Sequence, residues 1–133
     1  MEPAFLDLSE IVEIHHDQIE RYGGKPGIRD VAALESALAM PRAGSRDRYF
    51  HADLFEMAAA YLYHMVKNHP FVDGNKCTGA MAAFMFLRFN GFSLKAPNEE
   101  LERMVVATAA GKVDKAALTQ FLRKHSRRGS GRG

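Results

Sequence analysis

The 133-residue sequence has one cysteine, no tryptophan and no apolar run of the roughly 18 residues that a membrane span needs. The single Cys77 excludes an internal disulfide and an all-cysteine zinc site, and it suits a reducing compartment. The first residues are acidic and contain no basic segment, so we expect no signal peptide, a cytoplasmic location and no membrane contact. The formal charge of +2 is too small for a general nucleic-acid binder, so no direct nucleic-acid contact is expected.

The composition is that of a soluble globular domain, with 47% hydrophobic and 26% charged residues. Residue spacing predicts helices over 8–21, 31–40, 54–68, 77–89, 99–110 and 115–124, and no convincing strand. The stretch 77–89 is apolar on nearly every face, so other helices must enclose it. We therefore predict an all-α compact bundle of about six helices around this central apolar helix. Residues 1–125 form the predicted single domain, and the Gly/Ser/Arg-rich residues 126–133 a disordered basic tail.

Two other stretches contain side chains that suggest function. His15 and His16 are adjacent and point to different sides of a helix, so we expect a core-edge His15 and a solvated His16 rather than a metal-binding pair. Residues 42–52 hold arginines and aromatics around a Gly-Ser turn without a clean period. We expect a solvated connection there, and the alternative is a flap or short hairpin that docks a substrate.

The segment His69–Lys76, with the sequence HPFVDGNK, concentrates polar chemistry just before the apolar helix. Gly74, Asn75 and Lys76 lie where a tight turn enters that helix. Converging backbone N–H groups, the helix dipole and the lysine charge favour an anion such as phosphate at this point. The sequence lacks the glycine and Lys-Ser/Thr spacing of a Walker A loop.

The side chains around this turn suggest transfer of a phosphate to a hydroxyl. Asp73 suits a Mg²⁺ ion bound between protein and phosphates. His69 titrates near neutrality and can accept a proton from an attacking hydroxyl. Phe71 is the expected anchor of the loop in the core. The spacing alone leaves open a simpler interpretation, a helix-capping turn with a buried, hydrogen-bonded histidine.

The string HPFVDGNKCTG resembles the signature loop of the Fic/Doc superfamily, HxFx(D/E)GN followed by a basic stretch. The lysine directly after Gly-Asn resembles the Doc (death on curing) branch, the toxins of toxin–antitoxin systems. The likeness covers nearly the whole chain, including the RYGGKPGIRD turn and the LRFNG end of the apolar helix. It implies the helical Fic/Doc fold.

The resemblance also implies roles for individual residues. His69, Asp73 and Lys76 match catalytic positions, with His69 as general base and Asp73 as the Mg²⁺ ligand. Gly74, Asn75, Lys76 and Thr78 are the implied contacts of the bound ATP. In Doc-type proteins the lysine goes with presentation of the γ-phosphate, so the resemblance implies a protein kinase, with AMP transfer to a protein hydroxyl as the alternative.

The implied target is a threonine of elongation factor Tu, whose modification stops translation. The implied partner is an antitoxin whose C-terminal segment folds over the active site. The chain lacks the (S/T)xxxE(G/N) motif of self-inhibiting relatives, which fits inhibition by a partner.

Cys77 departs from the family pattern, which has an arginine directly after Gly-Asn-Lys. Loss of that arginine removes a phosphate contact of about 1.5–3 kcal/mol, or roughly ten- to a hundred-fold in binding or rate. Arginines of the 42–48 loop could replace it, whereas Arg88 lies too far along the helix. Without a replacement, the chain would be a catalytically weakened partner-binding module.

Cys77 has two interpretations of its own. A thiol at a helix N-terminus beside a lysine can act as a nucleophile, with His69 as its base. The expectation we favour is a small buried side chain that fills the space of the missing arginine.

Overall fold

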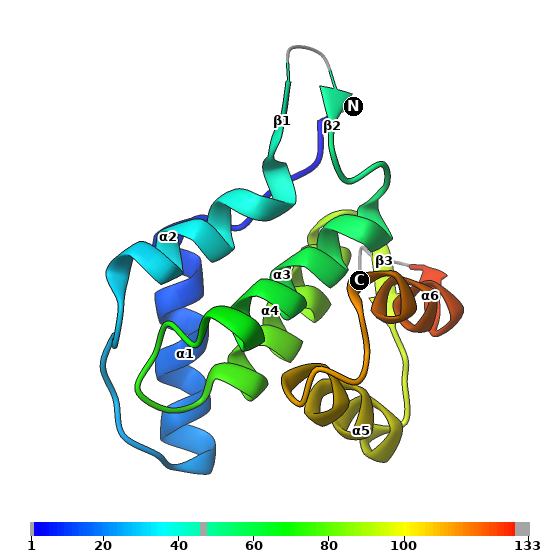
Figure 1. The fold of residues 1–133 in the computed structure, drawn as a ribbon. Coiled ribbons are helices and arrows are strands. Elements are labelled where there is room, and N and C mark those ends of the chain that lie inside the picture. Colours follow the sequence, from blue (N-terminus) through cyan, green and yellow to red (C-terminus); the bar gives the residue numbers. More distant parts are fainter. Residues whose placement is uncertain (1, 46–47, 130–133) are drawn as a thin grey trace.

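The computed structural model describes residues 2–45 and 48–129, and Figure 1 shows them as a bundle of helices. The described residues form six α-helices, which confirms the predicted all-α class. They are α1 (Leu8–Tyr22), α2 (Val31–Ala39), α3 (Leu54–Asn68), α4 (Asn75–Phe89), α5 (Asn98–Ala109) and α6 (Lys115–Lys124), with a short 3₁₀ helix η1 (Met40–Arg42) after α2. None of the described helices combines the length and the apolar character of a membrane span.

Aspartate side chains begin four of these helices. Asp7, Asp30, Asp53 and Asp114 each accept a hydrogen bond from the backbone N–H three residues further on. Such a bond satisfies one of the N–H groups that lack a partner inside the helix. Helix α4 has no such cap, which matters for the site described below.

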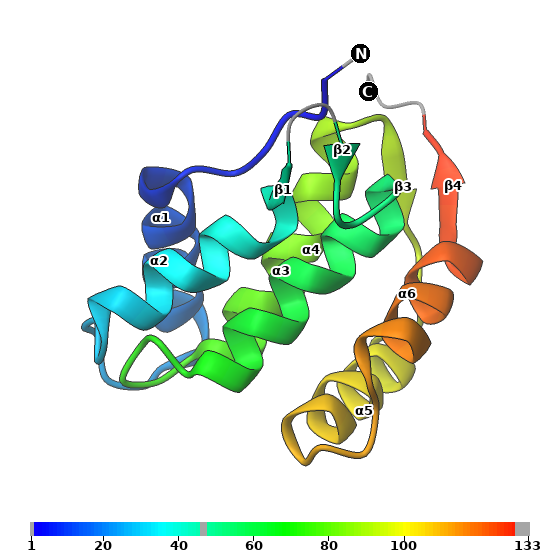
Figure 2. The same cartoon turned by 45° about the horizontal axis from the view of Figure 1, so that its top comes forward.

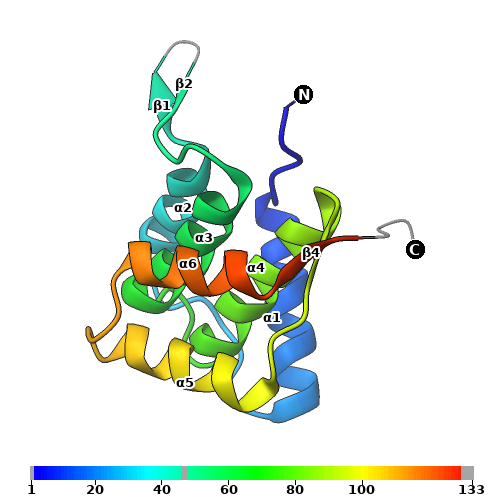
Figure 3. The same cartoon turned by 90° about the vertical axis from the view of Figure 1, so that its right-hand side faces the viewer.

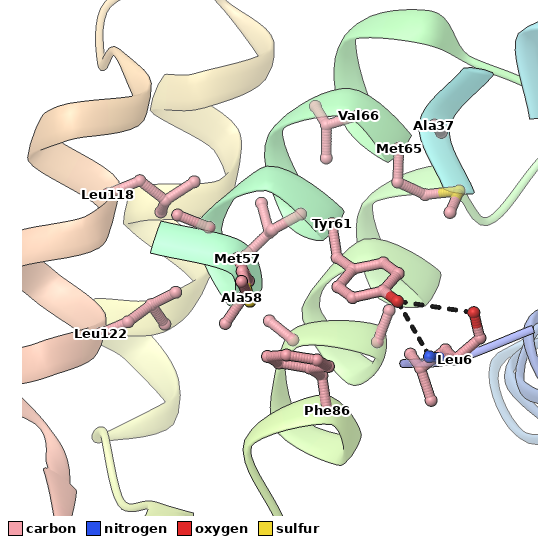
Figure 4. Close-up of a cluster of buried hydrophobic side chains, with 14 of the residues drawn as sticks. Leu6, Ala37, Met57, Ala58, Tyr61, Met65, Val66, Phe86, Leu118 and Leu122 are labelled. Atoms are coloured by element: carbon pink, nitrogen blue, oxygen red, sulfur yellow. Dashed lines mark hydrogen bonds between the residues drawn. The ribbon is translucent and has the colours of Figure 1, made fainter. Parts of the chain in front are cut away.

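Helices α3 and α4 lie side by side at the centre, with α1 and α2 on one side and α5 and α6 on the other (Figures 1 and 2). Figure 4 shows Tyr61 of α3 and Phe86 of α4 in the core between them. The Tyr61 hydroxyl accepts the N–H of Leu6 at 2.9 Å and donates to the Leu6 carbonyl, so it attaches the N-terminal segment to the core. Leu118 and Leu122 of α6 close the core from the other side.

Two short antiparallel sheets complete the fold. Strand β1 (Gly44–Ser45) pairs with β2 (Arg48–Tyr49) in a hairpin between η1 and α3. The short hairpin of the alternative is therefore confirmed for these residues, whereas its role in docking a substrate stays a prediction. Backbone pairing between two strands needs no apolar period in the side chains, so the sequence carries no clear signal of it.

The second sheet corrects the prediction of a disordered tail over residues 126–133. Strand β4 (Ser126–Arg128) follows α6 directly (Figure 3) and pairs with β3 (Phe92–Leu94), which lies beside it in Figure 2. The Arg128 guanidinium also lies over the Phe92 ring, 5.2 Å from its centroid, which is within the distance of a cation–π contact. Residues 130–133 of the predicted tail lie outside the described residues.

Candidate active site

The loop 69–74 joins α3 to α4 and runs along the segment between α1 and α2 (Figures 1 and 2). The Pro70 carbonyl accepts hydrogen bonds from the N–H groups of Arg29 and Asp30, at 2.7 and 3.0 Å. The Val72 N–H donates to the Gly27 carbonyl at 3.0 Å. These strand-like contacts hold the loop in one conformation, which is the first requirement for a site built on it.

His69 ends α3 in the left-handed conformation, with φ 52° and ψ 54°. Arg29 stabilises this uncommon backbone: its Nε donates to the His69 carbonyl at 2.6 Å and its Nη2 to the Asn68 carbonyl at 3.0 Å. The His69 side chain is exposed, and no hydrogen bond to it occurs within residues 2–45 and 48–129. The alternative of a buried, hydrogen-bonded histidine is therefore wrong.

Phe71 is buried and connects the loop to the core. The His15 ring stacks on the Phe71 ring with 3.8 Å between centroids and 6° between planes. Asn75 accepts the Phe71 N–H through Oδ1 and donates to the Phe71 carbonyl through Nδ2, both at 2.9 Å. The Asn75 side chain therefore serves the loop, and only its backbone N–H is left for an anion. His15 is buried, as the sequence predicts, and His16 is exposed.

Asp73 is exposed, and its orientation is set by two contacts. Its Oδ2 accepts the Lys25 N–H at 2.8 Å, and its main-chain carbonyl accepts a hydrogen bond from His15 Nε2 at 2.8 Å. Gly24, with φ +116°, passes so close that a Cβ there would lie 3.2 Å from the Asp73 Cβ. The turn at residues 24–25 thus requires glycine and holds the carboxylate in place.

Asp73 fits a Mg²⁺ ion that is shared with a nucleotide. In the described residues, no group of three or more histidine, cysteine or acidic side chains is placed to hold a metal. Mg²⁺ commonly uses only one or two carboxylates and completes its shell with phosphate oxygens and water. The single exposed carboxylate of Asp73 matches that pattern.

The first turn of α4 presents free hydrogen-bond donors. Its N-cap is Gly74, at φ 82°, and no side chain caps the helix. The first N–H groups of an uncapped helix need an outside acceptor, and the helix dipole favours an anionic one. Lys76 is exposed in the same turn and adds its positive charge. The arrangement suits a phosphate group.

The structure corrects the expectations for two residues of this turn. Thr78 is fully buried and its hydroxyl has no partner among the described residues, so it does not lie on the surface that a nucleotide would contact. Cys77 is exposed, against the expectation of a buried side chain. The physical reason is the rotation of α4, which turns Thr78 toward the core and Cys77 toward solvent.

The arginines proposed to replace the missing one lie elsewhere. Arg42 stacks over the Phe5 ring at 5.0 Å, and Arg48 belongs to the β1–β2 hairpin. Both precede α3, whereas His69 follows it, and the 15 residues of α3 separate the two ends by roughly 20 Å (Figure 1). Arg46 lies outside the described residues.

A pocket of about 610 Å³ opens beside the first turn of α4. Lys76 and Cys77 line one end, and Phe84, Leu101 and Val105 contribute apolar walls from α4 and α5. The size and the apolar lining with a few polar groups are typical of ligand sites.

Comparison with known proteins identifies the class. A family model described as the Fic/DOC family matches residues 5–87. The chain is 34% identical over 116 residues to "Protein kinase doc" of Escherichia phage P1, which covers 86% of this chain and 90% of that protein. It is 40% identical over 75 residues to "Toxin Doc" of Mycolicibacterium smegmatis, covering 56% of this chain and 58% of that protein. The chain therefore belongs to the Fic/Doc family. Within the family it falls in the Doc branch, which confirms the resemblance.

Sequence reasoning missed the residues that support the loop from outside the motif. Arg29, Gly24 and the Lys25 N–H all come from the segment between α1 and α2, far from the loop in sequence. The available signal was local: the RYGGKPGIRD stretch combines two adjacent glycines with an arginine directly before a helix-capping aspartate.

Proposed function

We propose that this protein is a Doc-like toxin and a nucleotide-dependent transferase that moves the γ-phosphate of ATP to a protein hydroxyl. The observation that supports this best is a loop with an exposed His69 at one end and, at the other, an uncapped helix N-terminus that carries Lys76. The target we propose is a threonine of elongation factor Tu, whose modification would arrest translation.

Each site residue has its own role in the proposed reaction. The His69 imidazole accepts the proton of the attacking hydroxyl, and its position in the left-handed turn aims it away from the core. The N–H groups of the first α4 turn and the Lys76 ammonium bind phosphate oxygens and stabilise the charge that develops during transfer. Asp73 would hold Mg²⁺, which neutralises phosphate charge when bound.

An antitoxin is the partner that this proposal requires. The pocket beside Lys76 and Cys77 continues along α4 toward α5 and has mainly apolar walls. A C-terminal antitoxin segment with an apolar face would bury that surface and cover the first turn of α4. Inhibition would then follow from exclusion of the nucleotide.

Labelled ATP tests the proposal directly. Purified protein is incubated with Mg²⁺, elongation factor Tu and ATP labelled at either the γ- or the α-phosphate. We expect transfer of the γ-label only, lost in His69→Ala and kept in His16→Ala, which removes an exposed histidine of α1. Transfer of the α-label would indicate AMP transfer instead.

A second candidate follows from Cys77, because no arginine of the described 42–48 stretch reaches the site. The protein would then bind its partner without catalysis. Absence of any label with wild-type protein, and its appearance in Cys77→Arg, would support this weakened module.

A further inference from the structure

A second cluster of nitrogen groups lies where the first residue of α6 meets α3. Lys115, the first residue of α6, places its Nζ 2.9 Å from His64 Nε2 of α3 and 3.2 Å from His51 Nε2 of the segment before α3. The same ammonium lies 5.5 Å from the centre of the Tyr63 ring. Lys115 and both histidines are half-buried, so the amine is enclosed but still open to a small molecule.

No carboxylate neutralises this amine. The salt bridges among residues 2–45 and 48–129 do not include Lys115. A Lys115 ammonium has donors only, so in that state both imidazoles accept at Nε2 and both rings are neutral. His51 Nδ1 is buried and finds no acceptor in the described structure. Both hydrogen-bond partners of the Lys115 ammonium are therefore neutral acceptors.

Burial lowers the pKa of all three groups, and the Lys115 charge lowers that of both histidines further. Burial lowers the pKa of Lys115. Burial first, then the Lys115 charge and His51, lower the pKa of His64 to about 4. Burial and the Lys115 charge lower the pKa of His51, opposed by the charge of Glu56 and by a Met40 backbone contact. A lysine in such surroundings holds more of the free amine at neutral pH than an exposed one.

We propose that Lys115 is a modification site, an acceptor of acyl groups from small acyl phosphates. Partial burial favours a lysine that acts as a nucleophile, and the adjacent His64 imidazole can accept its proton. The acyl donor must be small to reach a half-buried Nζ. It must also carry a good leaving group, because the proposed reaction uses no separate acyltransferase. Its negative charge is attracted by the Lys115 ammonium before that group loses its proton.

The chemical step balances without any further reactant. Lys115 first loses one proton to water, and its Nζ lone pair then attacks the carbonyl carbon of the acyl phosphate. The bond from that carbon to the phosphate oxygen breaks, and inorganic phosphate leaves with the electron pair. His64 Nε2 takes the remaining excess proton from the nitrogen and returns it to water. The product amide is uncharged and has one N–H, so it can donate to only one of the two imidazoles.

Acetyl phosphate and mass spectrometry test the proposal on the full chain. Peptide analysis gives the acetylation rate at Lys115 and at Lys112 and Lys124, two exposed lysines next to and within α6. We expect Lys115 to react about threefold faster or more, since each unit of lowered pKa gives roughly tenfold more free amine, partly offset by weaker nucleophilicity. Equal or slower reaction at Lys115 would overturn the proposal.

Variants and the pH dependence of the rate test whether the cluster, and not solvent exposure, sets the acetylation rate at Lys115. His64→Phe should reduce the Lys115 rate to that of the exposed lysines, while the matched His16→Phe leaves it unchanged. If circular dichroism shows that His64→Phe does not fold, the wild-type pH profile decides. The acetylation rate at Lys115 should reach its plateau at lower pH than at Lys112, and coincident profiles would refute the role of the cluster. Acetylation should also move the His64 proton resonance to a higher titration midpoint, because the adjacent charge is removed.

Discussion

Arg29 donates from Nε to the main-chain carbonyl of His69 at 2.6 Å, although 39 residues lie between them in the chain. The same guanidinium reaches the preceding carbonyl, that of Asn68. Because these two bonds hold the only left-handed non-glycine residue among those described, Arg29 acts as a positioning residue for the imidazole. The contact links the segment before α2 to the proposed catalytic base.

Replacement of Arg29 should therefore reduce activity more than stability. We expect Arg29→Ala to lower the rate of phosphate transfer about tenfold, since two charge-assisted hydrogen bonds at an exposed site are lost. The measurement is the turnover rate with γ-labelled ATP. Arg88→Ala, at the exposed end of α4, is the matched control and should keep the wild-type rate. A wild-type rate in Arg29→Ala would show that the left-handed turn needs no support.

Gly24 and Gly23 provide a paired test of the Asp73 position. Both have positive φ, at +116° and +87°, so alanine is strained at either site. Only at Gly24 would the new Cβ press on Asp73, whereas nothing lies within 4 Å at Gly23. Gly24→Ala should weaken Mg²⁺-dependent activity well beyond Gly23→Ala, measured as the Mg²⁺ concentration for half-maximal rate. Similar values in the two variants would count against a role of the turn in holding the carboxylate.

His15 makes two contacts, and two variants can measure their separate contributions to stability. His15→Phe keeps an aromatic ring against Phe71 but removes the donor to the Asp73 carbonyl, and should cost about 1 kcal/mol in free energy of unfolding. His15→Ala also removes the stacking and leaves a cavity, so it should cost about 2–4 kcal/mol. Urea unfolding measures both. The interpretation fails if the two variants are equally stable.

Cys77→Arg should increase activity. The side chain is exposed at the edge of the pocket beside Lys76, so an arginine has room to reach a bound phosphate. A charge-assisted contact of about 1.5–3 kcal/mol corresponds to roughly ten- to a hundred-fold in binding or rate. Cys77→Ser is the control without a charge, and ATP affinity and transfer rate are the measurements. An arginine that changes neither would mean that the phosphates bind elsewhere.

His64 should make stability fall in acid. Its pKa of about 4 in the folded protein lies below the ordinary histidine pKa of 6.5, so the unfolded chain binds the proton first. Its contribution is fully present above pH 6.5 and is lost as the pH falls toward 4. After allowance for partial exposure, the loss should be about 2 kcal/mol. Urea unfolding at several pH values should show a smaller acid loss in His64→Gln than in wild type or His16→Gln.

The sequence by itself determined the helical class and the composition of the site. Apolar spacing and the aspartate caps are local signals, so they predict the helices within a few residues. The HPFVDGNK segment likewise contains the base, the carboxylate and the lysine within eight consecutive residues. A short stretch of chain of this kind can be interpreted without knowing what surrounds it.

Only the tertiary structure decided which way α4 faces and what supports the loop. A helix that is apolar on nearly all sides carries no pattern that sets its rotation, so Thr78 inside and Cys77 outside could not be predicted. The pairing of β3 with β4 joins main-chain groups more than 30 positions apart, and the Arg29 guanidinium reaches the main-chain carbonyl of His69 over a similar separation. Main-chain groups are the same in every residue, so the order of the side chains does not show which of them will be paired or accept the guanidinium.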